Sequence, residues 1–337
     1  MRPERREWLR AQVRWELGLL VALGAIVLLG TLVSSQFLTK GNLFYLCISI
    51  GEIAIMTLPL TLIVITGEID LSVASILGLA SAMLGYLVSQ GTPLWEAFAV
   101  VIALGVAAGL FNALLITRLG LPSLAVTIGT LTLYRGCAVV ILGPNIISTF
   151  PQRYTSIGVN PVGSSFLSYS VLFFLLLAVV FGVALHLTPF GRSLYVIGLN
   201  KDAALFAGIR VKRIKLSLYV LSGAICAFAG ILYTFRLSTA VQDNGLGLEL
   251  NVVAIVLLGG VSIFGGRGSI VGVVLAVFVY ATLQNVLFLT SFPQRAFGIV
   301  TGCLLLVSVL VPNAGELARR ARELRSRSRG RAAVEAG

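Results

Sequence analysis

The residues of this chain that could do chemistry are charged side chains beside or inside long apolar runs. The stretch GEIDLS at 67–72 carries Glu68 and Asp70 between two such runs, and Glu52 and Arg135 lie within others. A charge inside a bilayer costs about 2.5 to 3.5 kcal/mol on insertion scales, so each needs a polar partner or a wet cavity. We therefore expect Glu52 and Arg135 to mark an interior path and favour a functional or structural pair, although the sequence does not show whether the two side chains meet.

Two interpretations of GEIDLS stand side by side. Gly67 permits a break in a helix, and Asp70 or Ser72 can cap the next one, which would make the carboxylates structural. Alternatively, the broken segment lines a water-filled path, where irregular backbone is tolerated. For any single Asn or Thr in an apolar run, hydrogen bonding between helices is the favoured interpretation. The candidate residues for such a path are Glu52, Glu68, Asp70, Ser72, Asn112, Thr127, Arg135, Glu249 and Asn251.

Common catalytic motifs are missing from the sequence. It contains no G-x-x-x-x-G-K-[ST], H-E-x-x-H or G-x-S-x-G pattern, and its single histidine is His186. We expect no ATP hydrolysis by a phosphate loop, no catalytic residues, no metal and no cofactor. The GGRGS stretch at 265–269 looks like a phosphate cradle, but without a preceding soluble strand it is more typical of close helix packing or a tight turn. The four dispersed cysteines indicate packing residues, and they imply neither a metal site nor a disulfide.

The elements that hold these residues are apolar helices. Of 337 residues, 58% are hydrophobic and only 11% are charged, and the mean hydropathy is +1.00. These values exclude a soluble protein and predict an all-α integral membrane protein. Ten segments are long enough to span a bilayer, at roughly 17–34, 43–65, 71–89, 95–116, 122–143, 168–187, 216–235, 248–264, 269–289 and 296–311.

The positive charges predict how these spans are oriented. The net charge is +12, and Lys and Arg gather in 1–16, in the connection 188–215 and in the tail 312–337. Ten spans with both termini in the cytoplasm put all three clusters on the inner side, as the positive-inside rule requires. We therefore expect a membrane domain over 17–311 with basic cytoplasmic ends that lie against anionic headgroups, and no nucleic-acid binding.

Two connections are longer than the others. The connection 144–167 faces outward on this topology, and 188–215 faces the cytoplasm. Within the inner connection, Asn200 can cap a short helix and Gly208 can end it. Asp202 suits the positive end of its first turn, and Ala203, Phe206 and Ala207 share one face. Such a helix either docks on a partner or rests on the bilayer surface, and the pattern alone leaves both open.

A short internal similarity indicates an inverted repeat. DLSVASILG at 70–78 resembles ELNVVAIVLLG at 249–259. The first opens the third span and the second opens the eighth, five spans later, so they would run in opposite directions. Inverted repeats are common in transporters, with substrate sites near the repeat interface. A match this short also arises by chance. If the repeat is real, Glu249 and Asn251 would be partners of the GEIDLS segment.

Four ordered stretches resemble one family over about residues 15–312. They are ITGEIDLSVASILGLASAMLG, LPSLAVTIGTLTLYRG, FGRSLYVIGLNKDAALFAGIRVKRIK and LELNVVAIVLLGGVSIFGGRGSIVG. The chain resembles the membrane subunits of bacterial ABC importers of the ribose, rhamnose and autoinducer-2 group, most of all the rhamnose-type permeases. The resemblance implies an inner-membrane permease pair, identical or mixed, on a cytoplasmic ATPase subunit and fed by an extracytoplasmic sugar-binding protein. It also implies that Gly198, Asn200, Ala203, Ala204 and Gly208, next to Asp202 and Phe206, form the segment that couples to the ATPase.

The expected function is a path for a neutral monosaccharide or deoxysugar that leaves the substrate chemically unchanged. The alternative is a self-contained carrier driven by protons through Glu52, Asp70 or Glu249. An intramembrane enzyme has the weakest support, because no nucleophile can be paired with a base.

Overall fold

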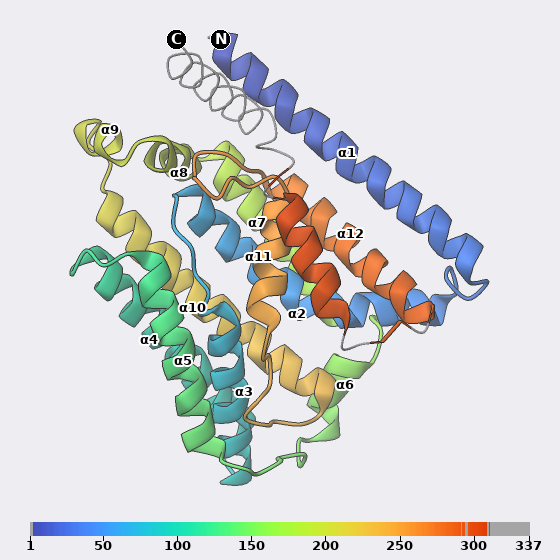
Figure 1. The fold of residues 1–337 in the computed structure, drawn as a ribbon. Coiled ribbons are helices and arrows are strands. Elements are labelled where there is room, and N and C mark those ends of the chain that lie inside the picture. Colours follow the sequence, from blue (N-terminus) through green and yellow to red (C-terminus); the bar gives the residue numbers. More distant parts are fainter. Residues whose placement is uncertain (1–2, 291, 294–295, 309, 311–337) are drawn as a thin grey trace, which may run out of the picture.

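The computed structural model is all-helical (Figure 1) and describes residues 3–290, 292–293, 296–308 and 310. Within these residues, seven helices are long and apolar enough to cross a membrane, and three shorter apolar helices accompany them. The seven are α1 (Pro3–Val33), α2 (Lys40–Ile65), α4 (Leu94–Thr117), α5 (Ser123–Leu142), α7 (Tyr169–Leu187), α10 (Val211–Leu237) and α12 (Ile270–Leu289). The three are α3 (Val73–Ser89), α11 (Leu248–Leu258) and Phe297–Ser308. Each of the ten predicted spans thus contains a helix, while the predicted tail 312–337 lies outside the described residues.

Side chains from the connections cap several of these helices. The hydroxyl of Thr39 accepts from the amide of Asn42 at the start of α2, and Ser168 accepts from Val171 at the start of α7. Ser269 does the same for α12. Capping satisfies amide groups that have no partner inside the helix, which matters most next to a bilayer.

The helices differ in how much of their surface other helices cover. In the most apolar part of α2, 89% of the residues are buried, against 11% in α1. Figure 1 shows α1 along the outside of the bundle, next to α12. α2 is therefore a central helix, whereas most of the surface of α1 is not covered by other helices of the chain.

Small residues let α4 and α10 approach closely. A Cβ atom on Gly109 would lie 2.2 Å from the carbonyl oxygen of Tyr219, and one on Gly223 would lie 2.1 Å from that of Gly105. Only glycine fits at such distances, and close backbone contact replaces the hydrophobic effect as the force between membrane helices.

The bundle has two ends, which we name after short helices. The α9 end holds α8 (Pro189–Leu199) and α9 (Lys201–Phe206), and the opposite α6 end holds α6 (Gln152–Val159) (Figure 1). α1 begins at the α9 end, since the indole of Trp15 donates to the carbonyl of Leu258, 2.9 Å away, and Ser269 donates to Glu16. α9 was predicted from the sequence, but α6 and α8 were not.

α3 and α11 run in opposite directions, as an inverted repeat requires. α3 leaves the α9 end, whereas α11 begins beside α3 and runs back toward the α9 end. The predicted span 248–264 is too long, because Gly259 ends α11 and Gly260 has a positive φ of 81°. α11 is thus a half-helix that follows an irregular segment at 238–247.

Candidate pathway and coupling sites

Among the described residues, three pairs of opposite charges lie at three depths of the bundle. At the α9 end, the ammonium of Lys215 donates to the carboxylate of Glu68. Farther in, the guanidinium of Arg135 is 3.9 Å from a carboxylate oxygen of Glu249. Toward the α6 end, Nε of Arg236 lies 3.0 Å from a carboxylate oxygen of Glu52.

The predicted pairing of Glu52 with Arg135 is therefore wrong. The structure gives each residue a different partner: Arg135 pairs with Glu249, at the start of the predicted span 248–264, and Glu52 pairs with Arg236. Arg236 lies in the last turn of α10, just past the predicted end of the α10 span. Its side chain reaches back into the bundle, which the span boundaries did not anticipate.

The pair near the α6 end joins three helices. The carboxylate of Glu52 on α2 is 1% exposed and also accepts from the hydroxyl of Ser170 on α7, at 2.8 Å. The guanidinium of Arg236 on α10 lies 4.8 Å from the ring centre of Tyr233. Each charge has a counter-charge and one further contact, which gives the pair a structural character.

Arg135 holds the irregular segment before α11 in place. Its guanidinium donates to the carbonyl oxygens of Asn244 and Gly245, at 2.7 and 2.6 Å, and more weakly to that of Ala74, at 3.4 Å. The side chain of Asn244 donates to the hydroxyl of Ser81, 2.7 Å away. The guanidinium of Arg135 thus bonds to carbonyl oxygens that would bond to backbone amides in a continuous helix. The backbone can therefore be irregular between two membrane helices.

Glu249 has unused hydrogen-bonding capacity beside Arg135. Its side chain is 16% exposed and that of Arg135 is 13% exposed. Oxygen Oε2 of Glu249 has no hydrogen-bond partner in the described part of the chain. The predicted partnership of Glu249 with GEIDLS is not seen, because Glu249 faces Arg135. Asn251 lies half-buried two residues farther along α11, and residues at that spacing do not share a helix face.

Asp70 stabilises the turn that leads into α3. One carboxylate oxygen accepts from the amide and the hydroxyl of Ser72, at 2.9 and 2.6 Å, and the other accepts from Ser222 at 3.4 Å. Ser72 occupies the N-cap position of α3, but its side chain makes no capping bond. Burial raises the pKa of the Asp70 carboxyl, against the opposing effect of its hydrogen bonds. Asp70 thus satisfies a backbone amide just before α3, as the structural interpretation of GEIDLS predicted. Ser72 does not cap the helix, however, and Glu68 pairs with Lys215 instead.

The predicted polar residues around Asp70 are enclosed by helices. The side-chain amide of Asn112 on α4 donates to the hydroxyl of Ser72, 2.8 Å away, and accepts from Tyr134 on α5 at 3.0 Å. Thr127 on α5 donates to the carbonyl of Ile69, at 3.3 Å. Asp70, Ser72, Asn112 and Thr127 are each at most 1% exposed, so none of them lines an open path in this conformation.

α9 forms as predicted. The side-chain oxygen of Asn200 accepts from the amides of Asp202 and Ala203, both at 2.9 Å. Gly208 follows the helix with a φ of 77°. The predicted face of Ala203, Phe206 and Ala207 is exposed, and Phe206 is 93% exposed.

Ala204 differs from its neighbours on α9. It is fully buried, and it packs with Ile197 and Val211 in a small core that fixes α9 between α8 and α10. Ala204 was predicted to belong to the coupling segment, but its side chain cannot contact a partner directly.

The segment before α9 is fixed to two other parts of the α9 end. A Cβ atom on Gly198 would lie 1.9 Å from the carbonyl oxygen of Ile65 at the end of α2 and 2.3 Å from the amide nitrogen of Gly266. The amide of Gly266 donates to that same Ile65 carbonyl, at 2.8 Å. The hydroxyl of Tyr195 donates to the carbonyl of Gly268, at 2.8 Å, and burial raises its pKa.

These contacts settle the character of GGRGS. Gly265 and Gly266 have φ angles of 82° and 73°, and they lie against Gly67, Gly198 and Leu199. The stretch is a tight turn packed on its neighbours, as predicted. The turn packs between the end of α8 and Gly67, the first residue of the GEIDLS segment.

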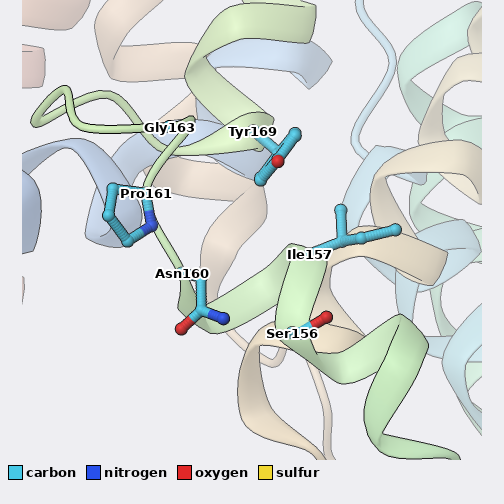
Figure 2. Close-up of a pocket in the computed structure, with 6 residues that line it drawn as sticks. All are labelled: Ser156, Ile157, Asn160, Pro161, Gly163 and Tyr169. Carbon is cyan, nitrogen blue, oxygen red and sulfur yellow. The ribbon is translucent and has the colours of Figure 1, made fainter.

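A hollow that sequence reasoning missed lies at the α6 end. Figure 2 shows the side chains of α6 and of the following connection around it. Its volume is about 370 Å³, and it is lined by Ser156, Ile157, Asn160, Pro161, Gly163 and Tyr169. The sequence carried little signal for it beyond the polar composition of 144–167.

Comparison with known proteins identifies similar chains. A family described as "Branched-chain amino acid transport system / permease component" matches residues 42–309. An autoinducer 2 import system permease protein of Klebsiella pneumoniae subsp. pneumoniae is 33% identical over 90% of this chain and 92% of its own length. A ribose import permease protein of Bacillus subtilis is 33% identical, with 89% and 93% covered. An L-arabinose ABC transporter permease protein of Azospirillum brasilense is 33% identical, with 86% and 85% covered. No solved structure matches the chain.

Proposed function

Because the chain belongs to the family of branched-chain amino acid transport system permease components, we propose that it forms the membrane path of an ATP-driven importer for a neutral sugar or sugar-like molecule. The names of three similar permeases, for autoinducer 2, ribose and L-arabinose, support this substrate class over a branched-chain amino acid. The chain itself is a non-catalytic, multi-pass membrane subunit. A separate ATPase would supply the energy, and an extracytoplasmic binding protein would deliver the substrate.

The observation that carries the proposal is the Arg135 and Glu249 pair beside the broken segment. Discontinuous helices form substrate sites near the bilayer midplane in other transporters. Oxygen Oε2 of Glu249 is buried beside Arg135 in this conformation. Once a movement of the helices exposes the pair, the carboxylate accepts from a hydroxyl and the guanidinium donates to one, which suits an uncharged polyol. The other two pairs, Glu52 with Arg236 and Glu68 with Lys215, would hold the helices around this site.

A second permease copy, identical or different, would complete the path. In this conformation the polar cluster around Asp70 is enclosed, so the path is better placed at the surface of the chain. The exposed face of α5 suits contact with this second copy. Ala125, Gly129, Thr132 and Gly136 follow one another along that face, next to Arg135. Small residues allow a partner to approach closely, and the exposed threonine offers a polar contact.

We place the α9 end in the cytoplasm, with both termini, a permease domain over 17–311 and basic ends at 1–16 and 312–337. The positive residues of 188–215 lie at this end, which the positive-inside rule favours. The exposed Phe206 face would dock on the ATPase. Movement of α9 would then pass through Gly198 to the end of α2, and through Lys215 to Glu68, where α3 begins.

Reconstituted uptake tests the substrate class. The chain, with its ATPase and binding protein in proteoliposomes, should take up rhamnose, ribose, arabinose or autoinducer 2 when ATP is present, and it should not take up leucine. Uptake of leucine alone would refute the proposal. A proton gradient that drives uptake by the chain without its partners would favour the secondary carrier instead.

A matched pair of variants tests the site. Glu249→Gln removes the charge but keeps the size, so we expect the apparent affinity for the sugar to fall several-fold while insertion is unchanged. Glu96→Gln changes an exposed residue in the first turn of α4 and should have no effect. Equal affinities for the two variants would show that Glu249 does not contact substrate.

A further inference from the structure

A groove of about 520 Å³ lies at the α9 end, where α8, the end of α9 and the first turns of α10 meet. Among its lining residues are Phe190, Ser193, Arg210, Arg213, Ile214 and Ser217. Ala207 and Gly208 at the end of α9, which belong to the coupling segment, also line the groove, but the path and coupling sites use none of the six side chains just named.

The lining combines positive charge with apolar surface. Arg210 and Arg213 are exposed, and within the described residues neither guanidinium forms an ion pair. Two serine hydroxyls add hydrogen-bonding groups, whereas Phe190 and Ile214 pack against the core of the bundle. Within the part of the chain that the structure describes, no acidic residue lines the groove. Nearby Lys215 adds no free charge, because Glu68 neutralises it.

The groove lies at the level where two spanning helices end. α7 ends at Leu187, three residues before Phe190, and α10 begins at Val211, directly after Arg210. The positive end of the 27-residue helix α10 therefore points toward this region. At this level a membrane presents phosphate groups above and acyl chains below.

We propose that the groove binds the headgroup of an anionic phospholipid. The two guanidinium groups bind the phosphate. The hydroxyls of Ser193 and Ser217 donate to the carbonyls of Pro189 and Ile214, so each is left to accept from a hydroxyl of the headgroup. Phe190 and Ile214 contact the beginning of an acyl chain. An acidic protein surface would satisfy the guanidinium groups as well, but it would leave the apolar wall of the groove unused.

Lipid binding to the purified full-length chain tests this proposal. Native mass spectrometry measures how many molecules of phosphatidylglycerol stay bound, compared with phosphatidylcholine. Each arginine near an anionic surface contributes about 1 kcal/mol, so the double variant Arg210→Gln, Arg213→Gln should bind phosphatidylglycerol roughly 30-fold more weakly. Lys212→Gln is the matched control, because Lys212 is exposed on the same turn but does not line the groove.

Several outcomes of these experiments would overturn the proposal. Unchanged binding in the double variant, or an equal loss in Lys212→Gln, removes the groove as the site. Displacement of the lipid by millimolar inorganic phosphate indicates a site for a free anion. Loss of ATPase binding with lipid binding intact indicates a protein-docking surface. If the double variant does not insert, the two single variants should each lose roughly fivefold in affinity, and no loss in either contradicts the proposal.

Discussion

Replacing Gly198 by alanine tests how the segment before α9 is held against the membrane helices. The new Cβ atom would lie 1.9 Å from the carbonyl oxygen of Ile65 and 2.3 Å from the amide nitrogen of Gly266. Both neighbours are backbone atoms, so α8 must shift away from them. Overpacking costs about 1–3 kcal/mol, and loss of the 2.8 Å bond from Gly266 to Ile65 adds about 1 kcal/mol. We therefore expect a loss of about 2–4 kcal/mol in the free energy of unfolding.

The assay compares two glycine variants. Gly182→Ala is the control, because no atom lies within 4 Å of its Cβ position on α7 and alanine favours a helix. Unfolding in detergent measures stability, and ATP-driven uptake in proteoliposomes measures coupling. Gly198→Ala should insert, unfold more easily and lose uptake, while Gly182→Ala should behave like the unmodified chain. If Gly198→Ala keeps both stability and uptake, the close contact does not transmit motion.

Three further predictions concern single side chains. Glu52→Leu leaves Arg236 without its counter-charge and should lower the free energy of unfolding by about 3–5 kcal/mol. Adding Arg236→Met should recover most of this loss. A double variant that is as unstable as the single one in unfolding experiments contradicts the pairing. Asp70→Asn keeps the bonds to Ser72, so we expect a change under about 1 kcal/mol and continued uptake at neutral pH. Because burial raises the pKa of Asp70, the native protein should gain stability relative to this variant as pH falls through that raised pKa, and thermal unfolding that shows the opposite trend refutes the assignment. Phe206→Asp alters an exposed side chain and should change stability by less than about 0.5 kcal/mol, yet it should abolish stimulation of the ATPase; full stimulation excludes docking through this face.

Features that depend on local sequence were predictable. Hydropathy located the seven spanning-length helices and the three shorter apolar ones, because a bilayer requires long apolar helices. α9 was found from Asn200 and Gly208, since a cap and a terminator act on amides a few residues away. The tight turn at 265–269 was recognised from its glycines for the same reason.

Features that join distant residues were not predictable. Glu52 and Arg236 are 184 positions apart, and Glu68 and Lys215 are 147 apart. The spacing of charges in a sequence does not reveal which helices pack together, so Arg135 was assigned the wrong partner. The burial of Ala204 depends on side chains from α8 and α10 in the same way.

The break before α11 was missed for a related reason. An apolar run reads as one continuous span whether or not a glycine ends its helix early. The hydrogen bonds from Arg135 to the carbonyls of Asn244 and Gly245 make the irregular backbone possible, and they come from a helix more than a hundred positions away.

The central claim is that motion from an ATPase enters through α9 on the cytoplasmic side of the membrane. Labelling of a single cysteine at Lys201 with a membrane-impermeant maleimide tests it directly, after the native cysteines at 47, 137, 226 and 303 are replaced. A cysteine at exposed Gln152 on α6 serves as the marker for the opposite side. Lys201→Cys should react in inverted vesicles and not in intact cells, and Gln152→Cys should do the reverse. Reaction of Lys201→Cys in intact cells would place α9 outside, where no ATPase can reach it, and would contradict the account.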